Sequence, residues 1–304
     1  MYYLKTLCMM LLLIACTSST SAPEGAPFSH YEGFGKYWYK GEAEITTYEL
    51  QQPRYGQMRK GHAILVMVTE PFNKTKYVKS DDPEAKDAVT VLKYNLIKRF
   101  TTGIYDYSQM ESVFTPVSKA SLPASLKVTY SNQDWCGQYF SSMTHTGKGL
   151  YIQHHSYFEG AETKKETLAV DLLEDELFNV IRINPEILPT GELTIIPNLL
   201  TTEMLHQDHA AHSAEASLKK NENGLMTYTL SYTDLPRKLV INFEGEAPYA
   251  IESWEESFKS SMNGQELTLK ATKKKRIWSP YWNQNSHQFD SLRNVLGLSQ
   301  EMND

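Results

Sequence analysis

The chain has 304 residues, of which 41% are hydrophobic, with a net charge of -6 at pH 7 and three cysteines. This length suits one large β domain or two ordinary domains, and the apolar content is ample for a packed core. The mild acidity argues against nucleic acid, and against an anionic bilayer, as the main partner.

The first 16 residues, MYYLKTLCMMLLLIAC, have the pattern of a lipoprotein signal peptide. One early cation, Lys5, precedes a short apolar run, which is too short for a transmembrane helix. The run ends in Leu-Ile-Ala-Cys, the lipobox pattern, in which the thiol of Cys16 takes the lipid. We expect a signal peptide over residues 1–15 and a protein held to a membrane by the lipid on Cys16. The alternative is an ordinary cleaved signal that contains a cysteine.

Residues 16–29 are small, polar and contain proline, which predicts a flexible tether. The residue after Cys16 is Thr17, and no acidic run follows, so we expect an outer-membrane lipoprotein of the cell envelope that faces the periplasm. Because Cys8 leaves with the leader and Cys16 takes lipid, Cys136 remains alone. A scaffold built on internal disulfides is therefore excluded.

The rest of the chain has the patterning of β-strands almost throughout. We expect strands at 36–50, 62–69, 89–100, 104–117, 125–131, 137–143, 150–158, 192–196, 214–219, 225–233, 237–243, 250–259 and 265–273. The run at 62–69 is apolar throughout, which is typical of a strand buried on both faces. Short connections at 147–149, 221–224 and 263–264 contain glycine and predict hairpins, which join antiparallel strands.

Only two segments have the periodicity of helices, 171–183 and 289–298. In the first, an acidic pair three residues apart predicts a capped start, and Pro185 ends the helix. The sequence therefore predicts a mainly β fold: a large curved antiparallel sheet, a β-roll or half-barrel, with two short helices. We expect residues 30–304 to form a single β-rich domain, with a soft division near 184–212 as the alternative.

Three histidines recur at every third position, His206, His209 and His212, with Asp208 among them. Imidazoles with a carboxylate can hold Zn²⁺ or Cu²⁺. On a helix, however, the first and third would face apart by roughly 120°. We therefore expect a polar connecting loop, no metal site and no cofactor.

His154 and His155 are neighbours on an expected strand, so their side chains should point to opposite faces. One of them could face a cavity with Glu159 nearby, and the alternative is a half-buried histidine of the sheet. Trp135 and Cys136 form a further candidate site. Because the spacing shows no base beside the thiol, we expect Cys136 to be a small buried hydrophobe.

Five short pieces resemble a group of envelope lipoproteins from Bacteroidota that are often labelled "septum formation inhibitor Maf". The pieces are Arg-Tyr-Gly at 54–56, Gly-Ile-Tyr at 103–105, Asp-Trp-Cys-Gly at 134–137, His-Ser-Tyr-Phe-Glu-Gly at 155–160 and Ser-Pro-Tyr-Trp at 279–282. With the lipobox, the resemblance spans nearly all of the mature chain. The Ser-x-Ser-Pro-Arg-Arg phosphate loop of true Maf pyrophosphatases is absent from the sequence. The resemblance therefore implies an envelope location, and it transfers no pyrophosphatase residue.

The hairpin-rich layout is also similar to periplasmic β-roll and half-barrel lipoproteins that hold apolar ligands. A curved sheet with a covered concave face makes an apolar cavity. We therefore expect a non-enzymatic, lipid-anchored envelope protein that binds an apolar ligand or another envelope component. The alternative is an envelope hydrolase, with or without a metal, that uses His154 and His155 or the histidines of 206–212.

Overall fold

The computed structural model describes residues 30–118, 125–146, 148–159, 164–169, 172–260 and 264–298. The described strands form one sheet in the order β10-β11-β12-β13-β14-β15-β1-β2-β4-β5-β6-β7-β8-β9, with β3 paired to β2 beside this path. Neighbouring strands of this sheet pair antiparallel, and β9 and β10 remain its two edges. The predicted mainly β fold with one large antiparallel sheet is confirmed.

The strands are β1 Ala43–Arg54, β2 Gln57–Asn73, β3 Val78–Lys79, β4 Ala88–Thr102, β5 Tyr105–Pro116, β6 Lys127–Asp134, β7 Gly137–Thr146, β8 Gly149–Ser156, β9 Lys164–Leu168, β10 Gly191–Ile195, β11 His212–Lys220, β12 Met226–Tyr232, β13 Arg237–Phe243, β14 Ile251–Lys259 and β15 Glu266–Ser279. The α-helices are α1 Phe34–Trp38, α2 Leu177–Ile183, α3 Leu199–Leu205 and α4 Ser291–Val295. Short 3-10 turns occupy Glu174–Glu176, Pro185–Ile187, Tyr281–Asn283 and His287–Phe289.

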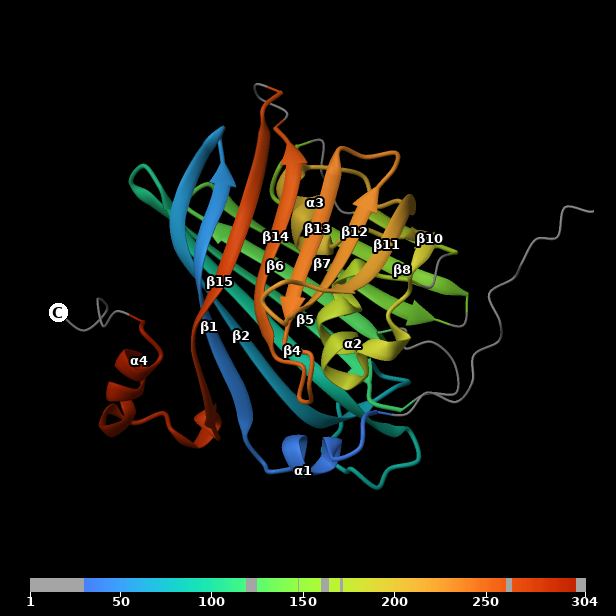
Figure 1. The fold of residues 1–304 in the computed structure, drawn as a ribbon, viewed down its shortest axis with the longest axis vertical. Coiled ribbons are helices and arrows are strands. Elements are labelled where there is room, and N and C mark those ends of the chain that lie inside the picture. The colour runs from blue at the N-terminus through green and yellow to red at the C-terminus, as the bar shows by residue number, and fades with distance from the viewer. Residues whose placement is uncertain are drawn as a thin grey trace, which may run out of the picture.

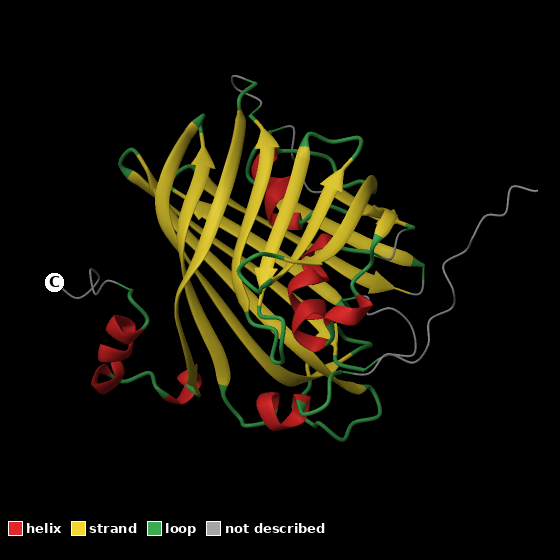
Figure 2. Cartoon of the chain, in the orientation of Figure 1, coloured by secondary structure: helices red, strands yellow, loops and turns green. Residues whose placement is uncertain are grey.

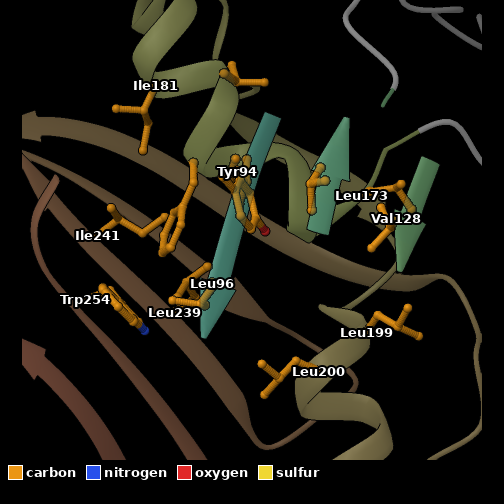
Figure 3. Close-up of a cluster of buried hydrophobic side chains, with 14 of the residues drawn as sticks. Tyr94, Leu96, Val128, Leu173, Ile181, Leu199, Leu200, Leu239, Ile241 and Trp254 are labelled. Atoms are coloured by element: carbon orange, nitrogen blue, oxygen red, sulfur yellow. The ribbon is translucent and has the colours of Figure 1, made fainter. Parts of the chain in front are cut away.

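The sheet is bent so that its two wings enclose α2 and α3 (Figures 1 and 2). One wing runs from β10 to β14 and the other from β4 to β9. Phe178 of α2 contacts both wings, because its ring centroid lies 5.2 Å from Trp254 of β14 and 5.8 Å from Tyr94 of β4. Figure 3 shows side chains of the two helices among those of the two wings. The concave face is therefore filled by helices and a shared apolar core.

Helix α2 is buried on every side, including its two polar residues. The side-chain nitrogen of Asn179 donates to the Leu92 carbonyl at 3.0 Å and to the Thr115 hydroxyl at 2.9 Å. Arg182 donates two hydrogen bonds, of 2.5 and 2.7 Å, to the carboxylate of Glu44 on β1. These bonds satisfy polar groups whose burial without a partner would cost stability, and they fix the helix to β4, β5 and β1.

The C-terminal segment covers part of the convex face. Leu296 and Leu298, which follow α4, pack against Ala43, Ile45 and Val66. On the other face of β2, Leu65 and Met67 belong to the main core (both buried). The prediction of burial on both faces is therefore confirmed for residues 65–67 of the run at 62–69.

The helices differ in part from the prediction. Residues 36–38 were expected in a strand but lie in α1, where Phe34 and Trp38 are buried against the core. The helix expected over 171–183 is shorter, because a 3-10 turn precedes α2; residue 171 lies outside the described residues. The helix expected over 289–298 is also shorter, and α3 was not expected. In the part of the chain that the structure describes, we find no helix with the length and apolar character needed to span a membrane.

Candidate functional site

A pocket of about 230 Å³ opens beside the C-terminal end of α3, where β7, β8 and β9 approach it. We name it the Glu203 pocket. Its lining comes from four segments that are far apart in sequence: Tyr139, His154, Ser156, Phe158, Glu166, Glu203, His206, Gln207, Asp208 and His209. Four of the residues singled out in the sequence, His154, His206, Asp208 and His209, therefore meet in one place.

Helix α3 holds Glu203 in the pocket. The side chain of Asn198 caps the helix by accepting a hydrogen bond from Thr201 N at 3.0 Å. The Thr201 hydroxyl donates in turn to Glu256 on β14, at 2.5 Å. At the other end, His206 adopts a left-handed conformation with φ 53°, which ends the helix. Both ends of this short helix are thereby fixed, so the position of Glu203 is set by the fold.

One oxygen of Glu203 is the centre of a hydrogen-bond network. Nδ1 of His154 lies 2.9 Å from Oε1 of Glu203 and 2.7 Å from Oγ of Ser141. The Ser141 hydroxyl also donates to the same carboxylate oxygen. Ser141 is fully buried, and Ser141 and Glu203 contact the same ring nitrogen of His154. The three residues therefore do not form a nucleophile relay. A relay requires the nucleophile and the acid on opposite nitrogens of the imidazole.

His209 extends the network toward solvent. Its Nε2 lies 3.0 Å from Oε1 of Glu203, and its Nδ1 lies 3.1 Å from Oε1 of Glu166. Burial alone would lower the pKa of His209, but the hydrogen bonds and charge of the two glutamates outweigh burial and raise it. His209 therefore favours the imidazolium form, in which both ring nitrogens donate.

The carboxyl of Glu203 is held in its ionised form. Burial acts to raise its pKa, but hydrogen bonds from His154, His209 and Ser141 lower the value to about 2. Glu166 and Asp208 add two carboxylates at the pocket. For His206, burial and the nearby charge of Arg54 lower the pKa, which favours the neutral ring. The pocket is therefore lined by the side chains of three acidic residues.

Two aromatic rings form the apolar side of the pocket. The centroids of Tyr139 and Phe158 lie 6.5 Å apart in an edge-on arrangement. Burial raises the pKa of Tyr139 to about 12, so its hydroxyl stays protonated. This buried hydroxyl has no hydrogen-bond partner of good geometry among the described residues.

The remaining candidate residues lie outside this pocket. His155 is exposed, on the face of β8 opposite His154, as the alternation predicts. Glu159 is also exposed and does not line the pocket; the carboxylate beside His154 belongs to Glu203. His212 lies 3.2 Å from the carboxylate of Asp234. Within the described ranges, no group of three or more His, Cys, Asp and Glu side chains has a metal-binding arrangement.

Trp135 and Cys136 lie at the tip of the β6–β7 hairpin. The prediction that Cys136 is buried is wrong: the thiol is free and exposed. The reason is the turn itself, since the carboxylate of Asp134 accepts a hydrogen bond from Cys136 N at 2.7 Å and holds the tip away from the core.

Comparison with protein-family models, with curated proteins and with solved structures finds no match for this chain.

Proposed function

We propose that the protein is a lipid-anchored component of the cell envelope that binds a small ligand in the Glu203 pocket without transforming it. The anchor rests on the lipobox that ends at Cys16, a residue outside the described part of the chain. The envelope location and the periplasmic face rest on the same leader and on Thr17.

One observation carries the binding role: the pocket combines two aromatic rings with a fixed line of carboxylates and imidazoles. Ligand sites typically pair apolar walls with a few precisely held polar groups. At about 230 Å³ the pocket is small, so the ligand is small or inserts only one end. Its polar side carries more carboxylates than imidazolium groups, which favours a cationic or hydrogen-bond-donating end. The rings of Tyr139 and Phe158 receive the apolar part.

A binding role is better supported than hydrolysis by the arrangement around His154. The hydroxyl nearest to the imidazole, that of Ser141, is fully buried and hydrogen-bonded to Glu203. A nucleophile must reach its substrate, and this hydroxyl faces the interior of the sheet. The hydrogen-bond network therefore fixes the positions of the charged groups of Glu203 and His209.

Three single-ring probes test the proposal on the full chain: benzamidine, benzyl alcohol and benzoate, with binding followed by ligand-observed NMR. We expect binding in the order benzamidine, benzyl alcohol, benzoate, because the lining carboxylates attract a cation. Phe158→Ala should weaken benzamidine binding roughly 2- to 10-fold, the contribution of one aromatic contact.

Phe140→Ala is the matched control. Phe140 follows the lining residue Tyr139 on β7, and its side chain is exposed on the opposite face of the strand. It should leave binding unchanged. Absence of binding by all three probes, or equal losses in the two variants, would refute a ligand site here.

A further inference from the structure

At one end of the strands, the tips of successive hairpins carry exposed aromatic and apolar side chains. Because neighbouring strands are antiparallel, the β1–β2, β4–β5 and β6–β7 turns and the end of β8 all lie at the same end of the strands. These positions hold Tyr55, Ile104, Trp135 and Tyr157, which are 45%, 83%, 70% and 72% exposed. We name these four side chains the aromatic rim.

Ring contacts connect the first three tips. The hydroxyls of Tyr55 and Tyr107 are 2.9 Å apart. The centroid of Tyr105 lies 5.7 Å from that of Tyr107 and 6.5 Å from that of Trp135. The exposed rings therefore stand on a connected aromatic base, and their positions are not independent.

The fourth tip joins the third through a glycine. A Cβ placed on Gly137 would lie 2.8 Å from the ring of Tyr157, so this ring packs directly on the backbone of the β6–β7 turn. The Tyr157 ring in turn lies 5.4 Å from Phe158 at the mouth of the Glu203 pocket. Contacts through Tyr105, Tyr107 and the Gly137 backbone thus connect the tips that hold Tyr55, Trp135 and Tyr157.

The charges near the aromatic rim are of both signs. Asp106, Asp134 and Glu159 lie at the turns, and Arg54, Arg59 and Arg99 lie on the strands within a few residues of them. Arg54 lies 4.5 Å from the centroid of the Tyr55 ring and donates to the Met204 carbonyl at 3.0 Å. Phosphate-rich partners, such as nucleic acids and anionic bilayers, require clusters of available cations. The rim therefore suits a neutral partner rich in hydroxyl groups.

The aromatic rim also lies far from the start of the described chain. Helix α1, near the start of the described residues, is at the opposite end of β1 (Figure 1). With 12 residues, β1 is about 40 Å long at roughly 3.3 Å per residue.

We propose that the aromatic rim binds a neutral, linear polysaccharide. The C–H groups on one face of a sugar ring are weakly positive and pack against the negative face of an aromatic ring. Sugar hydroxyls can donate to the Asp106 and Asp134 carboxylates. Tips of successive hairpins are two strands apart, about 10 Å, so a linear polymer laid across the tips meets Tyr55, Ile104, Trp135 and Tyr157 in turn.

The test is co-sedimentation of the full chain carrying Cys16→Ala, so that no acyl chain contributes, with chitin and with cellulose. The variant Trp135→Ala/Tyr157→Ala removes two exposed rings and should weaken binding roughly tenfold. The control is Trp282→Ala, which removes an exposed tryptophan beyond β15, at the other end of the sheet. Thermal unfolding establishes that the variants are folded.

The expected result is rim-dependent binding to at least one of the two glycans, with the Trp282→Ala variant equal to the parent. No sedimentation with either glycan, or equal sedimentation of the double variant, would overturn the proposal. A parallel arm uses vesicles of phosphatidylethanolamine and phosphatidylglycerol. Loss of vesicle binding on removal of Trp135 and Tyr157, with no glycan binding, would identify a bilayer as the partner and also overturn it.

Discussion

Oε1 of Glu203 and Nε2 of His209 lie 3.0 Å apart, joining the last turn of α3 to the segment that follows it. His209 has a pKa raised above 6.5, so the stabilisation from this pair is complete below pH 6.5 and is lost as the pH rises through the raised value. Glu203 has a pKa lowered from 4.5 to about 2, so its stabilisation is present above pH 4.5 and is lost as the pH falls toward 2. The pair stabilises the fold most between pH 4.5 and 6.5.

We therefore predict that His209→Gln flattens the fall in unfolding free energy between pH 6 and 9. Urea unfolding at a series of pH values measures this. Glu203→Gln should cost about 2–3 kcal/mol at pH 5.5, because it removes a buried charged acceptor. His212→Gln, at a histidine paired with the exposed Asp234, serves as control. Parallel pH profiles for His209→Gln and the parent would show that the pair does not titrate in this way.

We predict that the histidines of 206–212 are not a structural metal site. His209 is bound to two glutamates, His212 to Asp234, and His206 ends a helix. Purified protein should contain well under one equivalent of metal, and a chelator should leave the melting temperature unchanged. Stoichiometric zinc or copper by elemental analysis, lost in His206→Ala/His209→Ala/His212→Ala, would contradict this. It would also favour the hydrolase alternative.

Lipid anchoring predicts a clear change in fractionation. Cys16→Ala removes the thiol that we propose takes the lipid. Several acyl chains hold a protein stably to a membrane, so the variant should move to the soluble periplasmic fraction or remain uncleaved. Cys136→Ala, at the other cysteine expected in the mature chain, should stay with membranes. A mature-length Cys16→Ala protein found in the membrane fraction would rule out the lipid anchor.

Gly224 is predicted to be intolerant of a branched side chain. It lies in the exposed β11–β12 turn with φ 81°, a conformation that glycine adopts without strain. Gly224→Val should lower the free energy of unfolding by roughly 1–2 kcal/mol. Gly245→Ala is the control, since φ there is not positive and the added Cβ would meet only ordinary contacts. Equal denaturation midpoints for Gly224→Val and the parent would contradict the assigned strain.

Most strands could be predicted because alternation and turn residues are local signals. The hairpin at 221–224 is an example: Asn221 Oδ1 accepts hydrogen bonds from Asn223 N and Leu225 N, so the turn carries its own stabilisation. The connections at 147–149 and 263–264 include residues outside those described.

The helices were harder to predict because packing, and not local preference, selects them. The α1 sequence FGKYW is rich in aromatics that favour strands, yet burial of Phe34 and Trp38 makes it a helix. In α2, the apolar face was predicted, but the opposite face is buried as well. Arg182 lies there only because Glu44, 138 residues away, meets it inside the sheet.

In the candidate site, too, local signals could be predicted and contacts between distant residues could not. Alternation predicted that His154 and His155 point to opposite faces, and His154 is the buried one. Its partners Ser141 and Glu203 lie 13 and 49 residues away, so no spacing rule connects them. Glu203 stood beside the histidine cluster in sequence, but its importance depends on α3, which no strong periodicity predicted.

Strand β1 hydrogen-bonds to β2 on one side and to β15, the last strand of the described residues, on the other. During synthesis, one edge of β1 therefore stays without its native partner until nearly all of the chain is available. Unpaired edges recruit strands from other molecules, and pairings between distant parts of a chain form slowly. A truncation upstream of residue 266 would leave this edge permanently open, so early termination should yield aggregates instead of a smaller folded unit.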